Sequence, residues 1–392
     1  MAAGTRAGRS HGTLILWGII AFLWMIPVAS GQVSVWFALG QLGVAVGVLF
    51  ALIVTHEMGH AILGWLLGYR VFEVSIGAGY TLVQAVIGRT IVRFSLVPAG
   101  GHTLLAPKGD RLVPAREVFV SLAGPAVNLV TLLWAIVAEP PPAVRFPAIA
   151  MGVVLVVGNL WPRQAPTPLG VTPSDGLRAA HALDLDDAQV RQLIGGRYLG
   201  ESYVEHVKGD HEAALAWDER GLAAFPDDPS LSGDVATSLL LLGRFEGAQD
   251  RLRRLLARDD LLPLQRALFQ NNLAWADLMS GDPSLVAEAL AASEAAFAEL
   301  PMLPAVQGTR GFALILSGAI DDGIDLCTRS SRRHRVLDDR ASNLCAISIG
   351  AARQGRVAAA ERHLTQAIRL SPENRLIDRA GAELRSAREA AV

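Results

Sequence analysis

Long runs of apolar residues, followed by a stretch of mixed residues, divide the chain into two halves. Four apolar segments lie in the first half, at about residues 13–30, 33–67, 118–137 and 144–161. A helix needs about 20 apolar residues to cross the hydrocarbon core of a bilayer, so each segment is a candidate membrane span. The residues beyond about 178 lack such runs and are rich in Ala, Leu, Asp and Arg. We therefore expect a membrane-embedded half followed by a water-soluble half.

The first apolar segment has two interpretations. Arg6 and Arg9 precede it, and it ends in Pro-Val-Ala-Ser-Gly, which is typical of a signal-peptide cleavage region. The apolar run is long for a signal peptide, and this length favours a retained helix. In both interpretations the second segment begins outside the cell and ends inside it.

Basic residues predict the orientation of the spans. The loop between the second and third segments is basic: it contains Arg70, Arg89, Arg93, Lys108 and Arg111. The loop after the first segment has no Lys or Arg, and the loop after the third has only Arg145. Because cytoplasmic loops carry an excess of Lys and Arg, we place residues 68–115 and both ends of the chain in the cytoplasm. The expected location is the cell membrane.

Residues 69–106 follow a different pattern from the apolar segments. They are rich in Val, Ile, Thr and aromatic residues, with glycine breaks and stretches of alternation. This pattern is typical of strands, and we expect three or four short ones. The expected fold is therefore mainly α: a polytopic membrane helix bundle with a small membrane-associated β-sheet, followed by a soluble helical solenoid.

A repeated pattern organises the soluble half. Segments such as KGDHEAALAWDERGLAAFPDD and QGRVAAAERHLTQAIRLSPEN share a Gly-x-x-x-x-Ala core. The turn glycines recur at intervals of 34, 38, 37 and 37 residues; they are Gly209, Gly243, Gly281, Gly318 and Gly355. This period resembles a tetratricopeptide array of five helix pairs, in which glycine allows the turn within each pair. We place the membrane domain at residues 1–178 and the repeat domain at 190–392.

Repeat arrays of this kind usually bind peptides or proteins along a concave face. We therefore expect a protein partner at the repeats, although an array that only aids assembly or stability remains the alternative. Cys327 and Cys345, the two cysteines, have no CxxC neighbour and are expected to be buried core residues. The formal net charge of −2 gives no indication of nucleic-acid binding.

Two histidines and a glutamate interrupt the second apolar segment. The sequence His56-Glu57-Met58-Gly59-His60 matches H-E-x-x-H, and positions i and i+4 share one face of a helix. His56 and His60 can therefore bind one metal ion, and Glu57 can take a proton from water beside it. A chance match on a soluble helix is the alternative. Polar residues are costly in a membrane helix, which favours a functional metal site.

Three motifs, in this order on apolar segments, carry a family resemblance. HExxH in the second segment is followed by SLAGPAVNL in the third, and then by Asn159-x-x-Pro162 and Asp175-Gly176. Together they resemble the site-2 protease family, the M50-type intramembrane zinc metalloproteases, over about residues 33–180. The G-P-x-x-N element of that family falls on Gly124, Pro125 and Asn128, for which we expect a packing role.

The resemblance implies a role for each matching residue. His56, His60 and Asp175 would hold zinc, with one ion per chain. Glu57 would be the general base that activates the attacking water. Asn159 would position the substrate or stabilise the developing oxyanion, as an amide donor can in a low-dielectric site.

Asp175 departs from the usual spacing of this motif. The aspartate of the family commonly lies closer to the asparagine, whereas here the proline-rich insertion RQAPTPLGVTP separates them. Ser174 and Asp175 are also good N-cap residues for a following helix. No other acidic residue lies near the fourth segment, which favours Asp175 as the third ligand. His102 is a further candidate, although a histidine beside a Gly-Gly turn is more often an ordinary turn residue.

The expected function is that of an intramembrane zinc endopeptidase acting on a membrane-protein substrate in the lipid bilayer. The enzyme would cleave a transmembrane segment, and the repeats would recruit substrate or regulators. A helical substrate hides its carbonyl groups, so an exposed sheet edge could hold the unwound segment as an added strand. One alternative is a non-catalytic membrane scaffold that binds partner proteins through the repeats. Another is a membrane zinc hydrolase that acts on lipids or soluble peptides.

Overall fold

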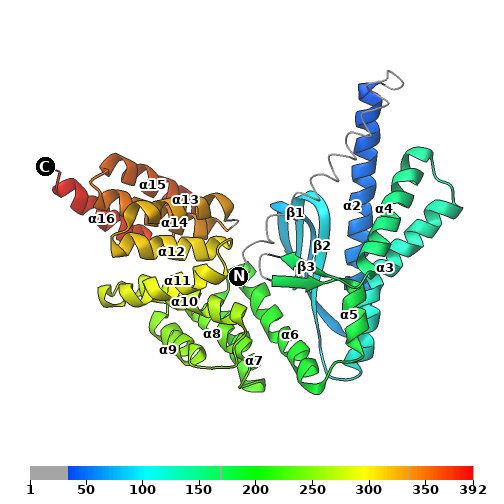
Figure 1. Cartoon of the computed structure of the whole chain (residues 1–392), viewed down its shortest axis with the longest axis horizontal. Coiled ribbons are helices and arrows are strands. Elements are labelled where there is room, and N and C mark those ends of the chain that lie inside the picture. Colours follow the sequence, from blue (N-terminus) through cyan, green and yellow to red (C-terminus); the bar gives the residue numbers. More distant parts are fainter. Residues whose placement is uncertain (1–33, 168–169, 335, 392) are drawn as a thin grey trace, which may run out of the picture.

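The computed structural model describes residues 34–167, 170–334 and 336–391. Three long helices lie on one side of the molecule, an array of shorter helices lies on the other, and a β-sheet lies between them (Figure 1). The first predicted apolar segment, at residues 13–30, is outside the described residues. The predicted domain limits, residues 178 and 190, lie inside helix α5 (Asp175–Ala182) and helix α6 (Asp187–Lys208), on either side of the loop that joins them, and the division stays a prediction.

The three long helices coincide with the second, third and fourth predicted segments. They are α2 (Val35–Leu66), α3 (Val113–Val137) and α4 (Pro142–Leu160), and each is long and apolar enough to cross a membrane. Many of their large apolar side chains are exposed, and Trp36 and Val137 are among the most exposed. Such a continuous apolar surface is costly in water and suits contact with lipid.

The strand-rich segment forms two long strands that fold back on each other, β1 (Tyr69–Ile87) and β2 (Thr90–Pro107). The middle of β1 lies between two parts of β2, because Glu73 is the register partner of both Leu104 and Ile91. The last part of β1 pairs with the beginning of β2, and the first residues of β1 pair with the end of β2. Four strand segments therefore lie side by side, as the predicted number of short strands suggested, but they belong to two continuous strands.

A small hairpin and a short helix follow the last long helix. The insertion RQAPTPLGVTP forms strands β3 (Gln164–Thr167) and β4 (Gly170–Pro173), which pair antiparallel. Helix α5 (Asp175–Ala182) begins directly after them. It packs against α3 and α4. The insertion is therefore a folded element at the end of the membrane helices.

The described residues after α5 form five helix pairs and a final helix, α16 (Ile377–Glu389). The pairs are α6 (Asp187–Lys208) with α7 (His211–Ala224), α8 (Pro229–Leu242) with α9 (Phe245–Leu256), α10 (Pro263–Ser280) with α11 (Val286–Glu299), α12 (Pro304–Ser317) with α13 (Ile320–Arg333), and α14 (Leu337–Arg353) with α15 (Val357–Leu370). A short 3-10 turn, η1 (Pro283–Leu285), precedes α11.

Each predicted turn glycine lies between the two helices of one pair. All five have positive φ angles, from +70° to +102°, which non-glycine residues rarely adopt. The repeat prediction is confirmed. Cys327 on α13 and Cys345 on α14 are free, completely buried and part of one apolar core, as expected.

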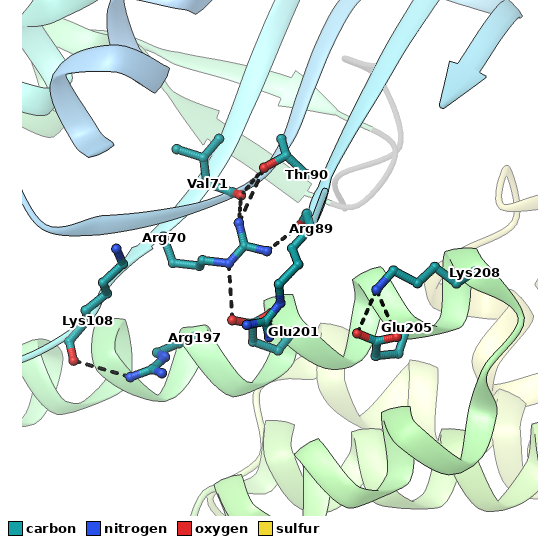
Figure 2. A network of polar contacts seen from close by, with 9 residues as sticks. All are labelled: Arg70, Val71, Arg89, Thr90, Lys108, Arg197, Glu201, Glu205 and Lys208. Atoms are coloured by element: carbon teal, nitrogen blue, oxygen red, sulfur yellow. Dashed lines mark hydrogen bonds and ion pairs between the residues drawn. The ribbon is translucent and has the colours of Figure 1, made fainter. Parts of the chain in front are cut away.

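Helix α6 connects the repeats to the sheet. Val204 packs with Phe72, Ile91 and Ala106 of the strands in a small apolar cluster. Beside this cluster, Arg70 and Arg89 of the sheet converge on Glu201 of α6, as Figure 2 shows. The Glu201 carboxylate is 1% exposed, and its distances to Arg70 Nε and Arg89 Nη2 are 3.2 and 2.8 Å. The first helix of the repeats is thus packed on the sheet through apolar and ionic contacts.

Candidate active site and metal centre

Helices α2 and α5 bring three metal-binding side chains together. His56 and His60 lie one helical turn apart on α2, and Asp175 is the first residue of α5. The two Nε2 atoms are 3.2 Å apart, and Asp175 Oδ2 lies 3.2 Å from His56 Nε2 and 3.5 Å from His60 Nε2. Among the described residues, this trio forms the one cluster of His, Cys, Asp and Glu side chains able to share an ion.

The distances in this cluster fit a zinc ion. Zinc binds histidine nitrogen and carboxylate oxygen at about 2.0–2.2 Å, so neighbouring ligands of a tetrahedral site are about 3.3–3.5 Å apart. The three separations between the ligand atoms of His56, His60 and Asp175 are 3.2, 3.2 and 3.5 Å. Three protein ligands also leave a fourth position open, which a catalytic zinc site requires.

Helix α3 holds the outer nitrogens of the two imidazoles. His60 Nδ1 donates its hydrogen to the backbone oxygen of Val120 at 2.7 Å. In this tautomer Nε2 carries a lone pair, which faces the site. Asn128 lies against His56 Nδ1 at 3.0 Å through its Nδ2 atom. Its Oδ1 atom has no hydrogen-bond partner among the described residues. A half-turn of this amide would let His56 Nδ1–H donate to Oδ1 and would free Nε2 for a metal.

Gly124 leaves space between the two imidazoles. It lies on α3 one turn before Asn128, and a Cβ atom there would be 2.4 Å from His60 Nε2 and 2.6 Å from His56 Nε2. Any side chain at this position would occupy the volume beside the two nitrogens. The G-P-x-x-N element, expected to pack the helix, therefore also shapes the surroundings of the histidines.

The inserted hairpin returns the chain to the site. Ser174 N donates to Arg163 O at 2.9 Å, and Ser174 Oγ donates to Trp161 O at 2.8 Å, so the two ends of the hairpin are joined. Ser174 also caps α5, because its Oγ accepts from Leu177 N at 3.3 Å. The capping role thus belongs to Ser174, and the Asp175 side chain points toward the histidines. The longer spacing does not separate Asp175 from the HExxH helix.

The electrostatic surroundings of Asp175 favour its charged form. Burial alone would raise the pKa of the Asp175 carboxyl, but hydrogen bonds with His56 and His60 lower this pKa well below its usual value. The next residue, Gly176, permits the close approach of α5 to α4, because a Cβ there would lie 1.9 Å from the Leu160 oxygen. Both features keep a carboxylate beside the two imidazoles.

Glu57 is held by the sheet. Its side chain is 5% exposed, and Thr103 Oγ1 donates to Glu57 Oε2 at 2.8 Å and lies 3.1 Å from the Glu57 backbone oxygen. Thr103 belongs to the last part of β2, and its register partner is Val74 of β1. A strand of the sheet therefore lies directly beside the candidate general base.

All of the predicted catalytic and metal-binding residues line one cavity of about 380 Å³. Its lining includes His56, Glu57, His60, Asn159 and Asp175. Asn159 comes from the last turn of α4 and is half-buried. Residues 99–103 of β2 also line this cavity.

His102 also lies on the cavity wall but is not part of the trio. Its Nε2 atom faces Glu73 Oε1 at 3.4 Å, and its side chain is 62% exposed. The alternative that His102 approaches a metal is therefore not supported by its position.

Comparison with known proteins identifies the family. A family model described as peptidase family M50 matches residues 44–295, which is more than half of the chain. The chain belongs to peptidase family M50. This M50 chain is also 28% identical over 144 residues to the "Putative zinc metalloprotease Cj1068" of Campylobacter jejuni. That match covers 33% of this chain and 37% of the relative, so the chain spans little more than a third of its length.

The solved structures similar to this M50 chain include proteins with tetratricopeptide (TPR) repeats. One is TTC0263, a thermophilic TPR protein of Thermus thermophilus, with 20% identity and a TM-score of 0.38 over 48% of this chain and 98% of that chain. The similar structures also include pilF of Pseudomonas aeruginosa, with 15% identity and a TM-score of 0.36 over 65% of this chain and 97% of that chain.

Two residues beside the proposed ligands make contacts that the sequence alone does not specify. Thr103 is a single hydroxyl in a strand, and only the pairing of the strands places it beside Glu57. Asn128 lies four residues after Gly124, so both share the face of α3 that meets the histidines. Its place in the G-P-x-x-N element was the available signal, but a packing role was expected there instead of a contact with His56.

Proposed function

We propose that this chain is a zinc endopeptidase that cleaves a transmembrane segment of a membrane-protein substrate. The observation that carries the proposal is the trio of His56, His60 and Asp175 beside the buried Glu57 carboxylate. The trio lies on and against a helix that is long and apolar enough to cross a membrane. A hydrolytic site at this depth suits a substrate that is itself within the bilayer.

One zinc ion per chain fits the donor set, and His56, His60 and Asp175 are its proposed ligands. When bound, zinc supplies Lewis acidity and lowers the pKa of water from that of bulk water to about 7. Glu57 accepts a proton from the attacking water and returns it to the leaving amine. Thr103 holds the Glu57 carboxylate in place during both transfers. Asn159, on the cavity wall, donates its amide to the oxyanion that develops on the substrate carbonyl.

The last part of β2 is the proposed place for the scissile segment. Residues 101–107 pair with β1 on one side only, in the register of the described strands. Residues 99–103 also line the cavity that holds Glu57. An unwound substrate segment can therefore add to this edge as a further strand, which satisfies its backbone and brings a carbonyl to the site.

The repeats recruit a protein partner or the substrate in this proposal. A groove of about 190 Å³ is lined by α8, α10, α12 and α14. Asn271 and Asn343 line it, are 7% and 6% exposed, and have Oδ1 atoms without a hydrogen-bond partner in the described ranges. Buried acceptors of this kind are costly until a ligand supplies N–H donors. The backbone of an extended peptide supplies them.

The orientation of the chain follows from its basic loop. Arg70, Arg89 and Arg93 lie on the sheet, at the end of α2 that carries the HExxH residues. The positive-inside rule puts this end, and the repeats attached to it, in the cytoplasm of a cell whose plasma membrane holds the chain. Cleavage then occurs near the cytoplasmic face.

New amino termini produced in membranes test the proposal. The wild-type chain, Glu57→Gln and the matched control Glu139→Gln are expressed separately in cells, and the amino termini of membrane proteins are then compared by mass spectrometry. Glu139 is a suitable control because it is exposed and lies in the loop after α3. Termini inside apolar spans should appear with the wild type and the control and should be absent with Glu57→Gln. Equal termini with Glu57→Gln would contradict the mechanism.

The trapped substrate then tests the role of the repeats. Glu57→Gln should retain the substrate, and adding Asn271→Ala and Asn343→Ala should weaken its capture while leaving zinc content unchanged. Undiminished capture by the triple variant would assign recruitment to another surface.

A further inference from the structure

A buried carboxylate connects the repeats to the strand beside Glu57. Glu73 lies in the middle of β1 and is 2% exposed. Tyr203 of α6 donates its hydroxyl to Glu73 Oε2 at 2.6 Å. On the same carboxylate, Glu73 Oε1 faces Arg93 Nη1 at 3.0 Å and His102 Nε2 at 3.4 Å. One side chain is thus shared by the first repeat helix and by two parts of β2.

The contacts around Glu73 form an ionic network. Arg93 Nη2 also donates to Tyr203 Oη at 3.0 Å, so the arginine, the tyrosine and Glu73 contact one another in pairs. Burial alone would raise the pKa of Glu73, but the hydrogen bonds of His102 and Tyr203 and the charge of Arg93 lower it. Burial and the contact with Glu73 raise the pKa of Tyr203 to about 12, so its hydroxyl remains a donor. Removing one partner of such a buried charged group is costly, because the rest of the network stays desolvated.

The edge strand links this network to the active site. His102, which contacts Glu73, is the direct neighbour of Thr103, which donates to Glu57 Oε2. Residues 101–104 carry both contacts and also pair with the middle of β1. The path from Tyr203 to Glu57 therefore passes through Glu73 and one short stretch of strand.

Helix α6 is held firmly on the sheet around Tyr203. Two residues before Tyr203, Glu201 binds Arg70 and Arg89 of the same sheet (Figure 2). The residue after Tyr203, Val204, is completely buried against the strands. The helix that begins the repeats is therefore held on the sheet on both sides of the tyrosine.

We infer that Tyr203 and Glu73 are positioning residues for the edge strand, residues 100–105, which holds Glu57 and would hold the substrate. The repeats thus contribute a residue to the geometry of the site, beyond recruiting partners. The role of the strand toward substrate rests on the proposed function, whereas its dependence on Tyr203 does not. The two claims can therefore fail separately.

Hydrogen–deuterium exchange of the full-length, zinc-loaded chain in detergent micelles tests this dependence. Tyr203→Phe removes only the hydroxyl, which donates to Glu73 and accepts from Arg93. Exchange of the peptide that covers residues 100–105 should become about tenfold faster, as expected for the loss of a hydrogen bond to a charged group. Peptides from α12 to α14 should exchange at the wild-type rate.

Tyr198→Phe is the matched control on the same helix. The Tyr198 ring packs with Trp217 and Phe225 of the repeats. Its variant should leave the exchange of residues 100–105 unchanged. Combining Tyr203→Phe with Glu73→Gln should accelerate that exchange less than the product of the two single effects, because both remove the same contact.

The inference is overturned if Tyr203→Phe leaves exchange of residues 100–105 within about twofold of the wild type. It is also overturned if exchange in α12 to α14 rises equally, since the loss would then be general instability. With a substrate from the terminus mapping, Tyr203→Phe should raise KM more than it lowers kcat while zinc content stays constant. A failure of proteolysis with a positive exchange result would refute the proposed function and leave the positioning role intact.

Discussion

Replacement of Gly124 by alanine tests the metal centre without removing a ligand. A Cβ at this position would lie 2.4 Å from His60 Nε2 and 2.6 Å from His56 Nε2, whereas ordinary contacts of a Cβ begin near 3.4 Å. Either the imidazoles or helix α3 would have to shift by about 1 Å to relieve the closer contact. The ligand distances of a metal site are expected to lie within about 0.2 Å of their usual values.

The added methyl group also competes with the ion for space. A carbon atom 2.4 and 2.6 Å from the two nitrogens would crowd a zinc ion, which binds histidine at about 2.0–2.1 Å. We therefore expect Gly124→Ala to weaken zinc binding by at least about 100-fold, the upper end of the range for changes around the ligands of a zinc site. Competition with a chromophoric chelator at equilibrium measures the affinity, and circular dichroism checks that the helices remain folded.

Gly152→Ala provides the matched control. Gly152 lies in the membrane helix α4, and a Cβ there would meet Leu132 Cβ at 3.4 Å, an ordinary contact. Its zinc affinity should equal that of the wild type. Wild-type affinity in a folded Gly124→Ala variant would refute the reasoning, because the space beside the imidazoles would then not be the metal position.

Three further predictions concern the surroundings of the site and the repeats. Asn128→Ala should lower zinc affinity by about 10- to 100-fold in the same chelator assay, because His56 loses the partner of its outer nitrogen; unchanged affinity would contradict this role. Glu201→Gln should lower the free energy of unfolding by about 1–3 kcal/mol in urea titrations. The effect is limited because Arg89 is exposed to solvent. An unchanged midpoint would show that the ionic contact does not contribute to stability. Burial raises the pKa of Asp218 to about 6, above its value of about 3.9 in an unfolded chain. The folded state therefore binds this proton more tightly than the unfolded state. The resulting stabilisation is complete below about pH 4 and is lost as the pH rises through about 6. Asp218→Asn should therefore remove about 3 kcal/mol of pH-dependent destabilisation across that window, and an identical pH profile in the variant would refute the assignment.

The features that could be predicted from the sequence are those that local patterns determine. Apolar run length located α2, α3 and α4, and the i, i+4 spacing placed His56 and His60 on one helix face. The glycines located every turn within the helix pairs, because a positive φ angle is a local requirement. The start of α3 was the main inaccuracy: the helix begins at Val113, since Pro114 and Arg116 are compatible with a first helical turn that precedes the apolar run.

The features that depend on long-range contacts could not be predicted. The pairing of Glu73 with two parts of β2 turns the expected short strands into two long ones, and no residue pattern specifies that register. Sequence spacing counted against Asp175, whereas the inserted hairpin closes on itself and returns the aspartate to α2. The docking of α6 on the sheet joins residues about 130 positions apart, such as Tyr203 and Glu73.

Zinc content per chain is the most direct test of the central claim. The wild type, His60→Ala and Asp175→Ala would be purified in detergent without added metal and analysed by elemental mass spectrometry. The proposed site predicts about one zinc per wild-type chain and loss of that zinc in both variants, since three protein ligands hold it. A well-folded wild type without zinc, or full zinc in Asp175→Ala, would contradict the site described by His56, His60 and Asp175.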